Sequence, residues 1–390
     1  ATIAANIIAK TLTATASAAN KVYDATNSAT TTLILSGLIG TETLTSSNTS
    51  TFNNKNVGTG KSVTVNSITL ADGTNGGLAA NYSISAGQTT TANITAKALT
   101  VSGITASNKV YDGNRTATLN TVSVTYTGLV GGDVFNGTYT GAFSDKNAGV
   151  NKTVTITPSY TGADVSNYSV NDHANVTANI TAKTLTATAS ASNKVYDGDN
   201  TATTTLTLSG LIGSETLDAT NNTSTFNNKN VGSNKTVTVN SITLANGTNG
   251  GLASNYSISP GQTTTANITA KPLSISGITA TNKTYDGDNT ATTTLTLSGF
   301  IGTETVTSTN SSTFNNKNVG TGKSVTVNSI TLADGTNGGL ASNYSIATGQ
   351  TTTANITPKA LTVSGITTSN KTYDGNTVAT LNTGGVTYTG

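Results

Sequence analysis

The 390-residue sequence contains no cysteine, no methionine and no tryptophan, and its only histidine is His173. Without cysteine the chain can form neither a disulfide framework nor a thiolate metal site. Cysteine and methionine are also the side chains that oxidise most readily, so their absence suits an extracellular protein. The sequence shows no Ser-His-Asp set, no metal-spaced histidine cluster and no glycine-rich phosphate loop. It therefore predicts no enzyme, no catalytic residue, no cofactor and no metal.

Charge and long apolar runs are scarce as well. Only 9% of the residues are charged, the net charge is +2, and the nineteen lysines and arginines are scattered singly. A nucleic-acid partner is not expected, because such proteins carry basic clusters. No apolar run approaches the roughly 18 residues of a membrane span, so none is expected in this segment.

One six-residue phrase recurs along the chain. It reads NKVYDG at 193–198, and close copies stand at 20–25, 108–113, 282–287 and 370–375. Its tyrosines are 85 to 89 residues apart, which exceeds the ~20–50 residues of a solenoid repeat and fits a small domain. The period predicts these segments: the end of a preceding repeat at 1–10, complete repeats at 11–97, 98–183 (divergent), 184–271 and 272–359, and a truncated fifth repeat at 360–390.

Alternation of apolar and polar residues predicts β-strands in every repeat. Val63 and Val65 share one face, and Ile68 and Leu70 resume the alternation one residue out of phase. This slip at Asn66–Ser67 predicts a bulge or bend. With glycine, asparagine and aspartate turns between about six or seven short strands, the pattern is typical of an all-β tandem array of small antiparallel, immunoglobulin-like β-sandwiches. β-grasp-like repeats are the alternative.

The recurring phrase is interpreted as structure. A tyrosine can bury its ring while its hydroxyl bonds to backbone at a strand end. Asp-Gly is a turn signal, and Ala25 replaces its glycine in the first copy at some cost. One phenylalanine per repeat is expected in the core. These structural motif residues are Tyr23, Asp24, Tyr111, Asp112, Tyr196, Asp197, Tyr285, Asp286, Tyr373, Asp374, Phe52, Phe143, Phe226 and Phe314.

Other local signals have weaker chemical interpretations. The pairs Asp197/Asp199 and Asp286/Asp288 resemble the start of a calcium loop, but the further oxygen ligands are missing. His173 is expected in a turn or on the surface. A Lys–Asn cross-link within the FNNKN phrase, assisted by an acid such as Glu42 or Glu215, would need all three groups buried together, so a surface lysine is the favoured interpretation.

The junctions between repeats lack flexible spacers. Residues 93–102 (NITAKALTVS) cross a boundary without glycine, and Pro272 and Pro358 stiffen two others. The last strand of one repeat is therefore expected to lead directly into the next, which favours an elongated, semi-rigid rod.

Several phrases recur in the same order: Lys-x-Tyr-Asp-Gly, Leu-Ser-Gly-Leu-Ile-Gly, Phe-x-x-Lys-Asn-Val-Gly, Asn-Tyr and Thr-Ala-Asn-Ile-Thr. Together they resemble the YDG-type and related MBG-type repeats of bacterial filamentous-haemagglutinin-like adhesins, across nearly the whole chain. Ala25 and the phrase FSDKNAG at 143–149 are minor departures. The resemblance implies a secreted or surface-attached protein whose repeats form a stalk, and it implies no catalytic residues.

The expected function is a structural stalk or filament segment that projects a binding tip or assembles into extracellular fibres. Neighbouring copies of the chain, or host glycans and proteins bound by other parts of it, are the expected partners. The alternative is a multivalent module that binds glycans or surfaces weakly, with affinity gained from repetition. Clustered and exposed Tyr126, Tyr139 and Tyr160 would favour that alternative.

Overall fold

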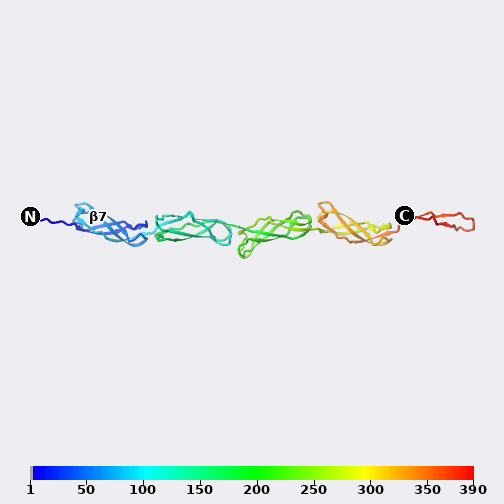
Figure 1. Ribbon diagram of the computed structural model, residues 1–390, viewed down its shortest axis with the longest axis horizontal. Helices are drawn as coiled ribbons and strands as arrows, with labels where there is room; N and C mark the ends of the chain where they lie inside the picture. Colours follow the sequence, from blue (N-terminus) through cyan, green and yellow to red (C-terminus); the bar gives the residue numbers. More distant parts are fainter. Residues whose placement is uncertain (1–2) are drawn as a thin grey trace. The chain divides into compact units, whose positions relative to one another are not determined.

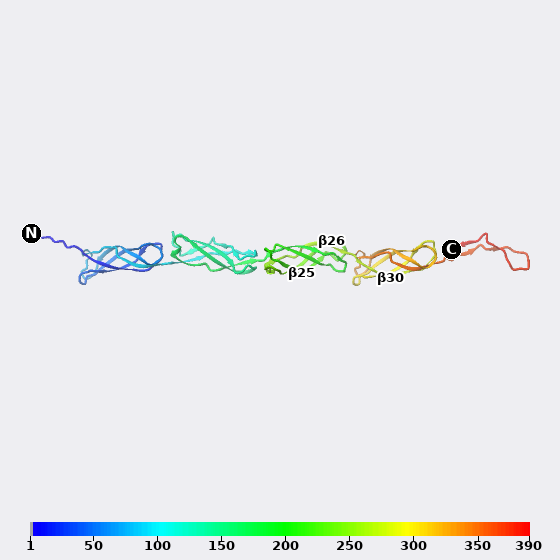
Figure 2. The ribbon, with the colours of Figure 1, turned by 90° about the horizontal axis from the view of Figure 1, so that it is seen from below.

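The computed structural model describes residues 3–390, except the side chains of 220–222. The first two residues of the segment expected at 1–10 thus lie outside the described part. The chain divides into two compact units. Unit 1 runs to Thr184 and includes Ser254–Ser257, and unit 2 comprises Leu185–Ala253 and Ile258–Gly390. Each repeat forms its own bundle of strands (Figures 1 and 2).

Unit 1 contains two repeats. Its strands are β1 (Lys10–Thr11), β2 (Thr13–Ala18), β3 (Lys21–Val22), β4 (Ser28–Ala29), β5 (Thr31–Ser36), β6 (Leu44–Phe52), β7 (Gly58–Asp72), β8 (Tyr82–Ser83), β9 (Thr89–Thr95), β10 (Lys97–Ser102), β11 (Thr105–Ala106), β12 (Lys109–Val110), β13 (Thr116–Ala117), β14 (Leu119–Asn120), β15 (Thr125–Thr127), β16 (Asn136–Phe143), β17 (Gly149–Thr161), β18 (Tyr168–Asn171), β19 (Val176–Thr181), β20 (Lys183–Thr184) and β27 (Tyr256–Ser257). Two 3₁₀ turns, η1 (Ala79–Asn81) and η2 (Val165–Asn167), precede β8 and β18.

Unit 2 contains the next two repeats and the start of a fifth. Its strands are β21 (Thr186–Ala191), β22 (Lys194–Val195), β23 (Thr201–Ala202), β24 (Thr204–Ser209), β25 (Leu217–Phe226), β26 (Gly232–Asn246), β28 (Thr263–Thr269), β29 (Lys271–Pro272), β30 (Ser274–Ala280), β31 (Lys283–Thr284), β32 (Thr290–Ala291), β33 (Thr293–Ser298), β34 (Val306–Phe314), β35 (Gly320–Asp334), β36 (Tyr344–Ser345), β37 (Thr351–Thr357), β38 (Thr362–Ser364), β39 (Thr367–Thr368), β40 (Leu381–Asn382) and β41 (Thr387–Thr389). The 3₁₀ turn η4 (Ala341–Asn343) precedes β36, and η3 (Ala253–Asn255) lies at the division between the units.

The predicted all-β tandem architecture is confirmed. Each complete repeat has a five-stranded sheet, ordered β3-β9-β7-β6-β4 in the first, and smaller sheets such as β2-β5 beside it. Most pairs are antiparallel, but β3 pairs with β9 in parallel, with Lys21 opposite Ile94. A purely antiparallel sheet was expected, and this edge differs because the two strands are separated by most of a repeat, long enough for a parallel crossover. No α-helix occurs in residues 3–390, so the helix-containing β-grasp alternative does not fit.

The bulge predicted at Asn66–Ser67 is confirmed. In the β6–β7 ladder, Thr49 lies opposite Ser67 and Ser50 lies opposite Val65, which leaves Asn66 as the extra residue. Its side-chain amide donates a 3.0 Å hydrogen bond to the Thr51 hydroxyl. The bulge lets Val63 and Val65 face the core before the strand shifts its phase.

The core of each repeat is small and mostly aliphatic, and it contains one recurring phenylalanine. Phe52, Phe143, Phe226 and Phe314 are all at most 2% exposed. In unit 1, the ammonium group of Lys21 lies 5.7 Å from the centre of the Phe52 ring. The recurring phrase and the recurring phenylalanine are therefore in contact within one repeat.

Within each unit, the complete repeats are joined by almost continuous strands. Only Ala96 separates β9 from β10, and only Ala270 separates β28 from β29. A strand that leaves one sheet therefore enters the next sheet directly, as the spacer-free sequence predicts. Among residues 3–390 no helix has the length and apolar character of a membrane span.

Candidate functional site

The lysine and aspartate of each recurring phrase build a local turn. In the first copy, Lys21 Nζ lies 2.7 Å from Asp24 Oδ1 and donates to the carbonyl oxygens of Thr26 and Ser28 at 2.9 and 3.0 Å. Asp24 Oδ1 also accepts the backbone N–H of Thr26 at 2.9 Å. Ala25 has φ = 63°, in the left-handed region that the glycines of the other copies adopt more easily.

The aspartates that resemble a calcium loop surround a lysine instead. Lys194 Nζ lies 2.7 Å from Asp197 and 2.8 Å from Asp199, and it also donates to the carbonyl oxygens of Asp199 and Thr201. Lys283 makes the same pairs with Asp286 and Asp288. The ammonium group thus takes the place that a cation would occupy among these oxygens. No group of three or more acidic, histidine or cysteine residues suited to a metal occurs in the described chain.

The tyrosine of the phrase has a different role from the one expected. Tyr23 is 1% exposed, but its hydroxyl does not bond to backbone at a strand end. It donates to the carboxylate of Asp133, which belongs to the next repeat, at 2.9 and 3.1 Å. The phrase therefore ends at a contact between two repeats, and the prediction of a purely internal turn is wrong on this point.

The second repeat of unit 1 presents an acceptor surface to Tyr23. Tyr168, the first residue of β18, donates its hydroxyl to the same Asp133 carboxylate at 2.5 Å and accepts the backbone N–H of Val130 at 3.0 Å. Its ring meets the Tyr23 ring edge-on, with centroids 5.6 Å apart. Asp133 thereby joins one phenol from each repeat.

A lysine from the first repeat completes the ionic part of this contact. Lys55, in the FNNKN phrase, lies 3.4 Å from Asp133 and 3.1 Å from Asp164. The side chain of Asp133 is 2% exposed and that of Asp164 is 12% exposed, whereas Lys55 remains 40% exposed. We refer to Tyr23, Lys55, Asp133, Asp164 and Tyr168 as the unit 1 junction cluster.

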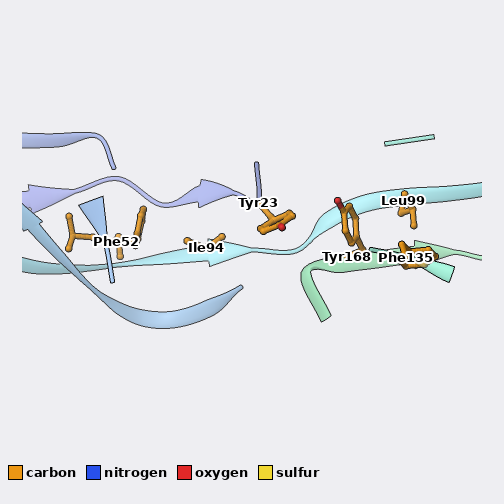
Figure 3. Close-up of a cluster of buried hydrophobic side chains, with 8 residues drawn as sticks. Tyr23, Phe52, Ile94, Leu99, Phe135 and Tyr168 are labelled. Carbon is orange, nitrogen blue, oxygen red and sulfur yellow. The ribbon is translucent and has the colours of Figure 1, made fainter. Parts of the chain in front are cut away.

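Backbone and apolar contacts surround the cluster. The N–H of Val57 donates to Asn167 Oδ1 at 3.0 Å, across the two repeats. The hydrophobic core is also continuous between the repeats, since Tyr23, Phe52 and Ile94 of the first join Leu99, Phe135 and Tyr168 of the second. Figure 3 shows Tyr23 between Ile94 and Tyr168. The two repeats therefore share one core as well as one polar network.

Unit 2 contains the same arrangement. Glu304 accepts hydrogen bonds from the hydroxyls of Tyr196 and Tyr344, each at 2.7 Å, and its Oε1 lies 3.0 Å from Lys229 Nζ. The Val231 N–H donates to Asn343 Oδ1 at 2.9 Å. We refer to Tyr196, Lys229, Glu304 and Tyr344 as the unit 2 junction cluster.

A third instance lies within unit 1. Asn255 Oδ1 accepts the Ala148 N–H at 2.8 Å, and the rings of Tyr111 and Tyr256 meet edge-on at 5.4 Å. An asparagine that accepts a backbone N–H and an edge-on tyrosine pair therefore recur at three places in the described chain.

Comparison with known protein families agrees with this repetition. The model of the YDG domain matches the chain four times, at residues 8–92, 95–178, 181–266 and 269–354.

The chain belongs to the YDG domain family.

Each matched range begins three residues before the repeat start expected from the sequence period, at 11, 98, 184 and 272. No curated protein matches the chain.

The protonation states of the YDG junction clusters follow from their burial and hydrogen bonds. Burial, and then the bond to Asp133, raises the pKa of Tyr168 to about 12. Burial also raises the pKa of Tyr344 to about 12, and the bond to Glu304 acts in the same direction. Burial alone would raise the pKa of Glu304, but the two tyrosine hydroxyls and Lys229 hold it below its ordinary value. At neutral pH the unit 2 junction cluster therefore contains a neutral Tyr344 phenol beside an ionised Glu304 carboxylate, and Tyr168 of the unit 1 junction cluster is a neutral phenol.

The remaining copies of the phrase lack a complete cluster. Tyr285 is half-buried and packs against the cluster that contains Phe314 and Ile356, and Tyr373 of the fifth copy is 94% exposed. Asp374 still forms its ion pair with Lys371, at 2.8 Å. The lysine–aspartate part of the turn thus forms from the phrase alone.

Sequence reasoning missed the role of several junction residues. Lys55, Asp133, Asp164 and Glu304 were not identified as partners of the tyrosine, and Asn-Tyr was recognised only as a landmark of the period. The available signal was that an acid, an Asn-Tyr pair and a lysine recur with the same period as the tyrosine. Lys55 and Lys229, from the FNNKN phrase, make ionic contacts with the next repeat, and at 40% and 41% exposed they are not buried as a cross-link with an asparagine would require.

The tyrosines that would favour a glycan-binding module are clustered but not open. Tyr126, Tyr139 and Tyr160 are all half-buried around Phe135. The Tyr126 and Tyr139 hydroxyls are 3.1 Å apart, and Tyr160 donates to Asp172 at 2.7 Å. These rings contact one another rather than offering a flat aromatic surface to a sugar. His173, nearby, contacts the carbonyl of Ala174 through Nδ1 at 2.6 Å.

Proposed function

We propose that this chain is a structural segment of a secreted or cell-surface bacterial repeat adhesin, in which serial YDG repeats act as a stalk or filament. The observation that supports this function is the use made of the repeat's recurring residues. Its tyrosine and its FNNKN lysine contact the next repeat, and its acid and Asn-Tyr pair contact the preceding repeat. A chain whose recurring residues connect neighbouring repeats is suited to bear tension and to form an elongated stalk.

Three features of the junctions favour an extended arrangement. A single residue separates the strands that enter successive sheets, so there is no slack for adjacent repeats to fold back. The core is continuous across the contact. The hydrogen-bonded carboxylate and the edge-on tyrosine pair also restrict rotation, since both have directional geometry.

Small-angle scattering of the 390-residue chain tests the stalk. Strands of ~8–10 residues give domains about 30–35 Å long, so four in a row would span on the order of 120–150 Å. A thin rod of that length has a radius of gyration of about 35–45 Å, against ~21 Å for a compact protein of this size. A value near 21 Å would reject the stalk.

A junction variant and its matched control sharpen the test. Glu304→Arg places a positive charge beside Lys229 and removes the acceptor of two phenols, so we expect greater flexibility and a broader distribution of distances in the scattering curve. Asp218→Arg changes the charge equally at an exposed site of β25 outside the junction clusters, and it is expected to leave the curve unchanged. Equal curves for the two variants would show that the junction does not hold the repeats in line.

A further inference from the structure

Strand β34 has an unpaired edge over half its length. On one side it pairs with β35 from Val306 to Phe314. On the other side it pairs only with the two residues of β32, opposite Ser312 and Thr313. In the first repeat β6 is the same, with β4 covering only Ser50 and Thr51. The first halves of both strands, Val306–Asn310 and Leu44–Asn48, therefore present backbone N–H and C=O groups without a backbone partner in the described chain.

These edges lack the protection that the other edges of the sheets have. At the opposite edge of each sheet, β3 and β31 are two residues long and begin with a lysine. Short length and lysine are two of the devices by which proteins prevent edge-to-edge pairing. The sequences of β6 (LTSSNTSTF) and β34 (VTSTNSSTF) contain no charge and no proline. Nothing in these two strands opposes the addition of another strand.

A groove lies beside the edge of β34. It has a volume of about 520 Å³ and runs between β33 and β34. Leu297, Phe300 and Val306 provide its apolar surface, and Thr296, Thr307 and Ser308 are among its polar residues. No charged side chain lines it. A groove of this volume and polarity accepts uncharged side chains rather than ions.

The second repeat shows what a closed form of this groove looks like. Tyr126 is equivalent to Leu297 of the fourth repeat, because each lies two residues before a glycine at the end of its strand. Tyr139 is equivalent to Asn310, because each lies four residues before the recurring phenylalanine. Their hydroxyls meet at 3.1 Å across the gap, and the Tyr126 ring packs on Phe135 at 5.2 Å. The aromatic side chains of this repeat fill the space that is open in the fourth repeat.

We propose that the free edges of β34 and β6 pair with the same edges of a second copy of this chain, as antiparallel strands related by a two-fold axis, with the partner's threonine and leucine side chains entering the adjoining groove. This lateral association rests on the proposed function and names the surface by which stalks join into fibres. The occupant is a second copy because an uncharged edge and an uncharged groove match the composition of the chain's own strands. Threonines placed opposite one another also form favourable cross-strand pairs.

The low charge of the whole chain favours the same partner. A net charge of +2 over 390 residues gives little repulsion between copies. One edge of five residues forms only a small, transient interface. Several such edges on one chain engage together with a higher effective affinity, which is the behaviour of a fibre.

Sedimentation velocity of the 390-residue chain over a range of concentrations tests the proposal. Successive residues of an antiparallel strand direct their backbone N–H groups to opposite sides of the strand. The backbone N–H groups of Phe52 and Phe314 point to the side of the free edge. Ser46 and Ser308 are each six residues earlier, so their backbone N–H groups point to the same side. The double variant Ser46→Pro/Ser308→Pro removes these two donors without breaking a ladder bond, since proline is tolerated on edge strands. We expect association at least about tenfold weaker, while Ser46→Ala/Ser308→Ala associates like the unchanged chain.

A second variant guards against misfolding of the proline form. Thr45→Lys/Thr307→Lys adds charge at two exposed side chains of the same edges, and we expect association to fall and to recover at high salt. A chain that stays monomeric at every concentration, or proline and lysine variants that associate like the alanine control, would overturn the proposal. The radius of gyration at low concentration distinguishes failure of the lateral pairing from failure of the proposed stalk function. An extended monomer would reject only the lateral pairing, whereas a compact monomer would reject the stalk.

Discussion

The junction clusters of the two units perform the same task with different acids. Unit 1 uses Asp133 with a second carboxylate, Asp164, whereas unit 2 uses the longer Glu304 and has Leu340 at the position equivalent to Asp164. In both, one carboxylate joins the phenols of two repeats, and an Asn side chain accepts a backbone N–H of the preceding repeat. The comparison teaches that the hydrogen-bond pattern is kept while the length and number of the acids vary.

The difference between the clusters lies mainly around the lysine. Lys55 has two carboxylates within 3.4 Å, and the ion pair with Asp164, followed by the contact with Tyr23, raises its pKa. Lys229 has Glu304 alone at 3.0 Å. In unit 1, Lys55 can therefore keep an ion pair with Asp164 when Asp133 is changed. In unit 2, Glu304 takes part in every polar contact of the cluster.

The largest expected effect is the loss of a junction tyrosine. Tyr23→Ala and Tyr196→Ala remove a buried ring from a core shared by two repeats, so each is expected to destabilise its junction by about 3–5 kcal/mol. Hydrogen exchange of the Val57 and Val231 amides, which cross the junctions, reports this directly. The matched Tyr→Phe variants keep the ring and are expected to cost only about 0.5–1.5 kcal/mol. An alanine effect no larger than the phenylalanine effect would show that the ring does not hold the junction.

The acids give the next largest effect, and they separate the two units. Glu304→Gln weakens charge-assisted bonds from two phenols and leaves Lys229 without its counter-ion, for an expected cost of about 1.5–3 kcal/mol. Asp133→Asn is expected to cost less, because Asp164 still pairs with Lys55. Exchange of the same two amides measures both. An Asp133 variant that costs as much as the Glu304 variant would remove the distinction between the units.

Changes of pH are expected to weaken the junctions from both sides. The pKa of Glu304 is lowered on folding, so its contribution is present above its ordinary value of 4.5 and is lost as the pH falls through the lower folded value. The pKa values of Tyr168 and Tyr344 are raised to about 12, so their contribution is complete below 10 and is lost as the pH rises toward 12.

Urea unfolding followed by near-ultraviolet circular dichroism checks this dependence between pH 3 and pH 11.5. A Tyr168→Phe/Tyr344→Phe double variant serves as the control. It should show a smaller alkaline decline than the original chain, and the rest of the decline comes from tyrosines such as Tyr23 and Tyr196, whose pKa values burial also raises. Unchanged stability from pH 8 to pH 11.5 in the original chain would contradict the assignment of the tyrosines.

The smallest expected effect concerns the lysines. Lys229 is 41% exposed, so Lys229→Met is expected to cost only about 0.2–1 kcal/mol, and less at high salt. Lys55→Met leaves two neighbouring carboxylates, Asp133 and Asp164, without a counter-ion. We therefore expect faster exchange of the Val57 amide in Lys55→Met than of the Val231 amide in Lys229→Met. The opposite order would show that the second carboxylate, Asp164, does not increase the contribution of Lys55 to its junction.

Features set by neighbouring residues could be predicted from the sequence. The period of the phrase predicted tandem copies, the alternation at Val63 and Val65 predicted a strand, and the phase slip predicted the bulge at Asn66. These features depend only on the alternation of side chains along a strand and on turn residues a few positions apart. They can therefore be predicted from short stretches of sequence.

The partners of the phrase's tyrosine were decided only by the tertiary structure. Tyr23 and Asp133 are 110 positions apart and belong to different repeats, so no local pattern relates them. Residue order alone specifies that each repeat carries a tyrosine, an acid, a lysine and an Asn-Tyr pair in that order. Which of them meet depends on the parallel pairing of β10 with β18 and on the entry of β9 directly into β10, because these non-local contacts place one repeat's phrase against the next repeat's acid.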